Sequence, residues 1–287
     1  MKNYSLTLAK NQMDLLLEMY GPYQVETNIP HAIFQAKKAD VSLIFYQNGT
    51  LLIKGEFQEE LRLIKNRLGL INFSAIGSDE VGTGDLFGPI VVCSAFVSAD
   101  DIEKLEAMGV RDSKNITDRQ IIELAPKLSK MLIHSVLILK PNKYNVMVRR
   151  GFNMNKIKAF LHNQAILLTV KKVEKEVPVI VDQFCLPKIY YNYLKDESKV
   201  YRDISFYTNA ENIHISVAAA SIIARYAFLA KMQQFSRFAG IRLLKGAGKD
   251  VDKQLVYLYK RKGYDTLRPI TKLNFRNLKK NQITPQN

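Results

Sequence analysis

Residues 78–91, SDEVGTGDLFGPIV, place two adjacent carboxylates, two glycines and a third acid at the end of an apolar run. In a regular strand, adjacent side chains point to opposite faces of the sheet, so Asp79 and Glu80 would be kept apart. The glycines at 82 and 84 allow a sharp turn and a close approach between the backbone and a bulky group. We therefore expect the strand to end or bulge here, so that both acids lean toward one point.

A second apolar run, VPVIVD, also ends in an acid, Asp182. The ends of neighbouring strands in an α/β sheet form a crevice in which ligands bind. Carboxylates gathered there repel one another unless a cation neutralises them. An all-oxygen ligand set, without Cys or an obvious His, favours Mg²⁺ or Mn²⁺ over zinc. Asp85, in contrast, is interpreted as a turn acid.

The segments around these acids predict two domains. From residue 73 onward, strand-like and helix-like segments alternate, which indicates an α/β layer fold with a mixed sheet. Residues 1–70 predict a separate β-α-β-β-β-α unit, in which Asn48-Gly49 forms a hairpin turn. We therefore expect an N-terminal domain of residues 1–70 and a catalytic domain of residues 71–287.

The charge of the chain is concentrated at one end. The net charge is +15, and the last 63 positions hold 15 Lys and Arg residues against 3 Asp and Glu residues. A basic stretch of this kind attracts a polyanion and releases counterions when it binds. A solvated tail that only aids solubility is the alternative.

Other features indicate a cytoplasmic protein that does not enter a membrane. No uninterrupted apolar run reaches the roughly 18 residues expected of a membrane-spanning helix. The first ten residues lack the basic start and apolar core of a secretion signal. Cys93 and Cys185 lie in apolar, strand-like runs, which favours free thiols in a reducing compartment.

Five motifs follow one another along the second domain: DEVGTGDLFGP (79–89), RDSK (111–114), YNVMVRRGFNMNKIKAFLHN (144–163), VDQF (181–184) and SVAAASIIAR (216–225). Together they resemble the prokaryotic type 2 ribonuclease H group, and ribonuclease HIII in particular. The type 2 enzymes proper more often have Gly-Arg-Gly where this chain has Gly82-Thr83-Gly84. Residues 1–70 also resemble the family's small α+β domain, which is similar to half of a TATA-binding-protein fold.

This resemblance implies a ribonuclease H fold with a mixed central sheet. It also implies an endoribonuclease that hydrolyses the RNA strand of RNA–DNA hybrids with two Mg²⁺ or Mn²⁺ ions, leaving 5′-phosphate and 3′-hydroxyl ends. The family's four catalytic, metal-binding acids fall on Asp79, Glu80, Asp182 and Glu211. From the residues alone, Glu211 could instead be a first-turn acid that stabilises a helix.

The resemblance further suggests residues that contact the substrate. By this resemblance, the backbone of the glycine turn would sense the 2′-hydroxyl, and two cationic side chains would contact phosphates. A serine would support the backbone. The residues in question are Gly82, Thr83, Gly84, Ser113, Lys114 and Arg225. Three histidines are interpreted as structural: His134, His162 and, as a helix cap rather than a proton shuttle, His214.

Three alternatives to this function stay open. The first is a type 2 enzyme that cleaves at single ribonucleotides embedded in DNA, and the second is a hybrid-binding protein without catalysis. The third is an unrelated small-molecule enzyme with an acidic Mg²⁺ site, which would leave the basic C-terminal stretch without a purpose. A monomer suits a basic surface that is kept free for substrate.

The resemblance also implies that the N-terminal domain helps to hold the hybrid. The charge of residues 1–72 gives this role little support, because their 8 basic and 7 acidic side chains leave a net charge of only +1. If this domain holds the hybrid, Lys37-Lys38 or aromatic contacts from Tyr4, Phe45 and Tyr46 are the candidates.

Overall fold

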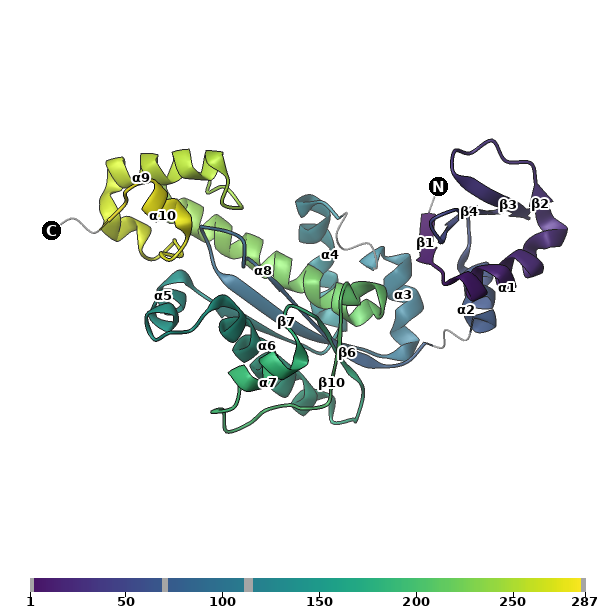
Figure 1. Ribbon diagram of the computed structural model, residues 1–287, viewed down its shortest axis with the longest axis horizontal. Coiled ribbons are helices and arrows are strands. Elements are labelled where there is room, and N and C mark those ends of the chain that lie inside the picture. The colour runs from purple at the N-terminus through teal and green to yellow at the C-terminus, as the bar shows by residue number, and fades with distance from the viewer. Residues whose placement is uncertain (1–2, 69–71, 111–115, 285–287) are drawn as a thin grey trace. The chain divides into compact units, whose positions relative to one another are not determined.

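The computed structural model describes residues 3–68, 72–110 and 116–284, and the chain divides into two compact units, Met1–Asn72 and Phe73–Asn287. Each unit has its own apolar core. Figure 1 shows the first unit in colours from purple to blue and the second from blue to yellow.

The N-terminal unit is an antiparallel five-stranded sheet with two helices. Its strand order is β1-β5-β4-β3-β2. The strands are β1 (Asn3–Thr7), β2 (Gln24–Val25), β3 (Ala32–Lys38), β4 (Val41–Tyr46) and β5 (Thr50–Lys54), and the helices are α1 (Lys10–Tyr20) and α2 (Gln58–Arg67). The predicted hairpin turn is confirmed, because Gly49 has a φ of +83° and the Thr50 N–H donates to the Asn48 side chain.

The aromatic residues of this unit are mostly core residues. Phe45 is fully buried, and Tyr4 is only 8% exposed. The suggestion that these two rings contact a substrate is therefore wrong, because the alternation of β1 and β4 turns both toward the helices. Lys38 is also engaged, since its ammonium lies 2.9 Å from Glu60 Oε1.

The C-terminal unit has a mixed five-stranded sheet with the order β10-β9-β6-β7-β8. Its strands are β6 (Ala75–Val81), β7 (Ile90–Val97), β8 (His134–Leu139), β9 (Val179–Asp182) and β10 (Ile204–Tyr207). Strands β10, β9 and β6 run parallel to one another, whereas β7 and β8 continue the sheet in antiparallel fashion. The parallel half therefore carries the ends of β6 and β9 to the same edge.

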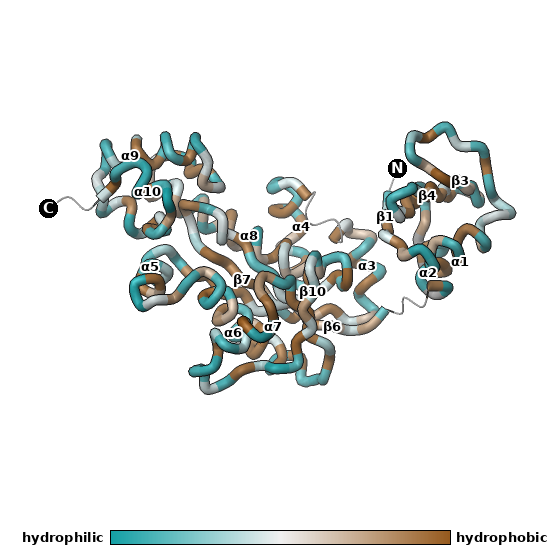
Figure 2. Tube along the Cα trace, in the orientation of Figure 1, coloured by the Kyte–Doolittle hydropathy of each residue, from teal (hydrophilic) through white to brown (hydrophobic). Residues whose placement is uncertain are grey.

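Helices cover both faces of this sheet. The long helix α8 (Ile215–Ala239) lies on one face, and α6 (Met154–Val173) lies on the other. The remaining helices of the unit are α3 (Ile102–Ala107), α4 (Asp118–Met131), α5 (Pro141–Arg149), α7 (Pro187–Tyr193), α9 (Lys249–Leu267) and α10 (Arg276–Lys280). Alternate residues of β7 separate the two cores: Val91 and Cys93 face α8, while Ile90 and Val92 face α6. In Figure 2 much of the length of the central strands carries the hydrophobic colour.

Helix α8 crosses the sheet at close range because its contact face is made of small residues. Ala218, Ala219 and Ala220 are fully buried. Opposite them, a side chain added at Gly77 of β6 would collide with the backbone of Ser216 and Val217. The length and composition of α8 would also allow it to cross a membrane, but most of its apolar stretch is buried in the core, and buried core helices meet the same criteria.

Candidate active site

The two adjacent acids lie within strand β6, on opposite faces of the sheet. The pairing of β6 with β7 continues without a shift from Ala75 to Val81, so the pleat is regular through both acids. Asp79 reaches Ser221 of α8, whereas Glu80 reaches Lys158 and His162 of α6. The expectation that alternation fails here is wrong, because the strand ends only after both residues.

Asp79 is held in an environment that disfavours its charge. Burial raises the pKa of the Asp79 carboxyl well above its ordinary value, and the nearby charges of Glu80 and Asp182 raise it further. The Ser221 hydroxyl and the Glu80 N–H, 2.7 Å from Asp79 Oδ1, oppose this only in part. A nearby cation would offset both the burial and the repulsion.

The neighbouring strand brings Asp182 to the same edge of the sheet. Ser78 pairs with Val181 across the parallel β6 and β9, so Asp79 and Asp182 are the next residue on each strand. Asp182 Oδ1 accepts a hydrogen bond of 2.9 Å from the Ala210 N–H. This bond anchors the short turn Ala210–Asn212, and with it the buried Glu211, beside the end of β9.

Glu80 is held by a network on the α6 face. Its Oε1 lies 2.5 Å from the Lys158 ammonium, and its Oε2 lies 2.9 Å from His162 Nε2. Burial disfavours the charge of Glu80, but the hydrogen bond with His162 and the charge of Lys158 outweigh it and lower the pKa of Glu80. On its other side, His162 Nδ1 lies 2.8 Å from the Ser78 hydroxyl, which donates to the Cys93 carbonyl.

Phe184, two residues beyond Asp182, completes this network. Its ring stacks on His162 with centroids 5.3 Å apart, and the Lys158 ammonium lies 4.1 Å from its centroid. Lys158 is therefore enclosed between a carboxylate and an aromatic face. Phe184 thus connects the end of β9 to the side chains that hold Glu80.

The donor set fits hard divalent cations. Asp79, Asp182 and Glu211 supply only oxygen ligands, and a cation beside Asp79 would offset the burial and the repulsion that raise the pKa of its carboxyl. Within residues 3–68, 72–110 and 116–284, no three His, Cys, Asp or Glu side chains are gathered closely enough to enclose an ion. The acids thus share one edge of the sheet, with Glu80 turned toward α6.

The sequence matches the family model for ribonuclease HII over residues 76–278. It is 49% identical to the ribonuclease HIII of Phytoplasma mali (strain AT) over 286 residues, which cover 99% of each chain. This chain belongs to the ribonuclease HIII family. The ribonuclease HIII of Bacillus pumilus is 40% identical over 96% of this chain and 97% of its own.

A solved structure of this family supports the fold and the metal dependence. The crystal structure of Bst-RNase HIII in complex with Mn²⁺ covers 98% of each chain at 35% identity, with a TM-score of 0.75. The predicted ribonuclease H fold and the predicted class of metal-dependent ribonuclease are therefore confirmed.

The glycine turn of this ribonuclease HIII chain has one buried and one open glycine. Gly82 has a φ of +91°, and a side chain there would collide with the Pro89 carbonyl oxygen. Gly84 is exposed and has no atom within contact distance of an added Cβ. The Asp85 N–H donates to the Gly82 carbonyl and closes the turn. Thr83 and Gly84 lie between these two residues and form the open part of the turn.

Residues from the C-terminal part of the ribonuclease HIII chain hydrogen-bond to this turn and hold it in place. The Asp85 carboxylate accepts a hydrogen bond from the Gly246 N–H, so Asp85 anchors the turn, as its interpretation as a turn acid implies. The buried Lys272 donates to the carbonyls of Asp85 and Gly88. Burial lowers the pKa of Lys272 to about 7, and Asp85 opposes this weakly.

Arg225, for which a phosphate contact is predicted, is engaged within the protein in this structure. Its guanidinium forms two hydrogen bonds with Asp118 Oδ1, at 3.1 and 2.6 Å, and a third of 2.8 Å with the Ile116 carbonyl. It therefore holds the start of α4, directly after the DSK motif. Ser113 and Lys114 lie outside the described residues.

Two histidines predicted to be structural have different surroundings, one at a helix start and one in the active site. His214 caps α8, as predicted, because its Nδ1 accepts from the Ser216 N–H while its Nε2 reaches the Phe73 carbonyl. His162 is fully buried, as a structural residue would be, but it also contacts Glu80. The spacing of Lys158 and His162, one helical turn apart within a motif of the family, is the signal that could have revealed it.

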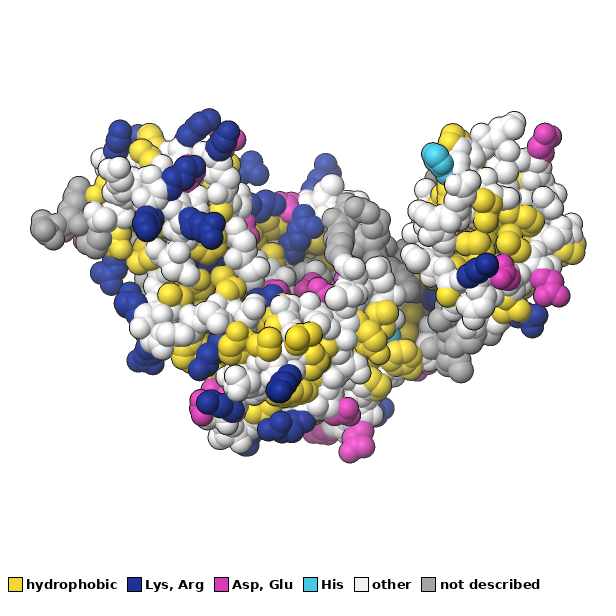
Figure 3. All heavy atoms as spheres, in the orientation of Figure 1, with side chains coloured by type: hydrophobic (Ala, Val, Ile, Leu, Met, Phe, Trp, Pro, Cys, Tyr) yellow, Lys and Arg dark blue, Asp and Glu magenta, His cyan; other side chains and the backbone are white. Residues whose placement is uncertain are grey.

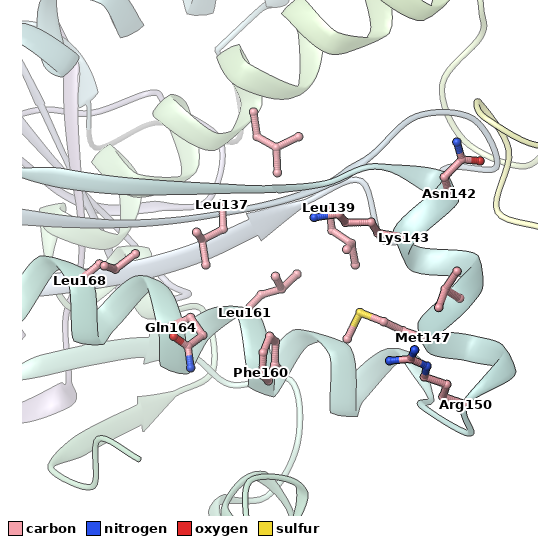
Figure 4. A pocket seen from close by; sticks show the side chains of 12 residues that line it. Leu137, Leu139, Asn142, Lys143, Met147, Arg150, Phe160, Leu161, Gln164 and Leu168 are labelled. Carbon is pink, nitrogen blue, oxygen red and sulfur yellow. The ribbon is translucent and has the colours of Figure 1, made fainter. Parts of the chain in front are cut away.

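A large apolar pocket lies elsewhere in the ribonuclease HIII fold. It measures about 670 Å³ and is formed by β8, α5 and α6, with Leu137, Met147 and Phe160 among its walls (Figure 4). No acid or histidine is present among the described residues that line it. It is therefore separate from the metal-binding chemistry.

Proposed function

We propose that this chain hydrolyses the RNA strand of RNA–DNA hybrids at Asp79, Glu80, Asp182 and Glu211, leaving 5′-phosphate and 3′-hydroxyl ends. The observation that carries the site is the buried carboxylate of Asp79, whose pKa is raised by burial and by repulsion from two further acids. Such a group gains most from a bound cation. The Mn²⁺ complex of the related Bst-RNase HIII supports the choice of metal.

The acids of the site would hold the ions in position and would not attack the substrate themselves. Divalent ions bound to these acids would supply an activated water and stabilise the leaving oxygen. Asp79 is fixed by Ser221 and by the Glu80 N–H, and Asp182 is fixed by the Ala210 N–H. These hydrogen bonds preorganise two of the oxygen ligands before an ion arrives.

Substrate binding is assigned to the basic C-terminal region and the glycine turn. Figure 3 shows Lys and Arg side chains gathered over α9 and α10. The exposed cations of residues 241–284, including Lys245, Lys253 and Lys280, which also pair with acids, are Arg242, Lys245, Lys249, Lys253, Lys260, Arg261, Lys262, Arg268, Arg276, Lys279 and Lys280. Their charge would hold the phosphates while the open turn at Thr83 and Gly84 meets the ribose. We place this reaction in the cytoplasm and assign it to a monomer.

A cleavage assay with three labelled substrates tests the proposal. With Mg²⁺ or Mn²⁺, a hybrid with a continuous RNA strand should be cut, whereas single-stranded RNA should not. A duplex with one embedded ribonucleotide tests the alternative type 2 specificity. Preferential cleavage of that duplex, or retention of full activity by Asp182→Asn, would overturn the proposal.

Gly84→Ala separates substrate recognition from folding. The added methyl group meets no protein atom, so we expect the midpoint of thermal unfolding to stay within about 2 °C of wild type. If the ribose packs against this backbone, the same methyl group should raise the KM for hybrid about tenfold. Steady-state kinetics and calorimetry measure both quantities, and an unchanged KM would remove Gly84 from the substrate contact.

Deletion of residues 1–72 tests the role of the N-terminal unit. The C-terminal unit has its own sheet and core, so we expect it to fold and to retain the maximal cleavage rate. Its affinity for hybrid should fall about tenfold, because a tethered second binding unit raises the effective concentration of substrate. Fluorescence anisotropy with labelled hybrid in Ca²⁺ measures this change. Unchanged affinity would show that the unit has another role.

A further inference from the structure

Lys158 is an unusual residue to find beside a metal-binding carboxylate. Its side chain is only 10% exposed, and its ammonium lies 2.5 Å from Glu80 Oε1. Placing a lysine in such a site is costly, and an apolar residue would fill the space against Phe184 more cheaply. The position of Lys158 therefore calls for a role beyond packing.

The two oxygens of Glu80 are both engaged by side chains of α6. Lys158 approaches Oε1, and His162, which is anchored by Ser78, approaches Oε2. An ion that used Glu80 would have to share this carboxylate with the ammonium or displace it. Either event opposes ion binding, because two positive charges on one carboxylate repel each other.

We propose that Lys158 competes with divalent cations for Glu80 and thereby sets the metal concentration that the enzyme requires. His162 is a positioning residue in this arrangement, since it keeps the other oxygen of Glu80 in place while the ammonium is exchanged for an ion. This inference rests on the proposed function, because it takes Glu80 as a ligand. It adds a built-in competitor whose removal strengthens metal binding.

The test is a direct measurement of Mn²⁺ binding to the full-length protein, by calorimetry or by electron paramagnetic resonance of the free ion. Lys158→Met keeps the length of the side chain but removes the charge, and we expect the Kd for Mn²⁺ to fall about fivefold or more. Lys158→Arg keeps the charge and should stay within about twofold of wild type. An unchanged or weaker affinity in Lys158→Met would overturn the inference.

Lys156→Met is the matched control. It removes the same charge from the same helix, but its ammonium lies over Phe152, 4.4 Å from the ring centroid. We expect its Mn²⁺ affinity to equal that of wild type, and a gain as large as that of Lys158→Met would show a general charge effect and refute direct competition.

Asp79→Asn distinguishes failure of this inference from failure of the proposed function. If Asp79→Asn abolishes Mn²⁺ binding while Lys158→Met leaves it unchanged, the metal site stands and the competition is wrong. If Asp79→Asn leaves Mn²⁺ binding unchanged, the proposed site itself is wrong, and the inference falls with it. Circular dichroism confirms that each variant is folded before its affinity is compared.

Discussion

Asp79→Asn is expected to lower the rate of hybrid cleavage at least about a thousandfold while leaving hybrid binding intact. Asparagine keeps the size of the side chain and can still contact Ser221, so the sheet edge should be preserved. It removes the charge at the point where burial and two neighbouring acids make a cation most favourable. Cleavage in Mg²⁺ and hybrid affinity in Ca²⁺ are the two measurements.

The same variant should be more stable than wild type when no ion is bound. The raised pKa means that folded wild type holds its Asp79 proton more tightly than the unfolded chain, whose carboxyl titrates near 3.8. The contribution of Asp79 to the stability of the wild type therefore falls as the pH rises above about 4, and the variant's amide, which does not titrate, makes no such contribution. Thermal unfolding in EDTA should show a gain for the variant at pH 8 that shrinks toward pH 4.

The control for this prediction is Asp100→Asn, which makes the same chemical change at a position outside the sheet edge. It should leave the cleavage rate at its wild-type value. Wild-type cleavage by Asp79→Asn would contradict the assignment of this acid to catalysis.

Gly77→Ala is expected to destabilise the catalytic unit by about 3 kcal/mol or more. The added methyl group would collide with the backbone of Ser216 and Val217, and backbone atoms cannot move aside as a flexible side chain can. Relief requires α8 to lift from β6, which would open the core around Ala218 and displace Ser221 from Asp79. Calorimetry should show a lower melting temperature for the C-terminal unit.

Gly21→Ala is the matched control for this substitution. Gly21 has a helical φ of −47° and no atom within contact distance of an added Cβ, so the change should be neutral or slightly stabilising. If Gly77→Ala melted at the wild-type temperature, the close packing of α8 on β6 would not be needed for stability.

Much of the fold follows from local pattern. The alternation of strands and helices predicted the mixed sheet of the C-terminal unit. Asn48-Gly49 predicted a hairpin of the N-terminal unit, because turn geometry depends on the backbone freedom of these residues themselves. Asp79 and Asp182 were identified because each acid follows an apolar run, and parallel strands end at a common edge.

The amino-acid sequence by itself therefore determined many of the strands and helices, though not the short strand β2, and it placed Asp79 and Asp182 at the edge of the sheet. Only the tertiary structure decided that Glu80 faces α6, that Lys158 and His162 hold it, and that Arg225 binds Asp118. The physical reason is distance along the chain. Strand and turn preferences depend on neighbouring residues, whereas these contacts join side chains about 80 to 110 positions apart, which meet only when helices pack on the sheet.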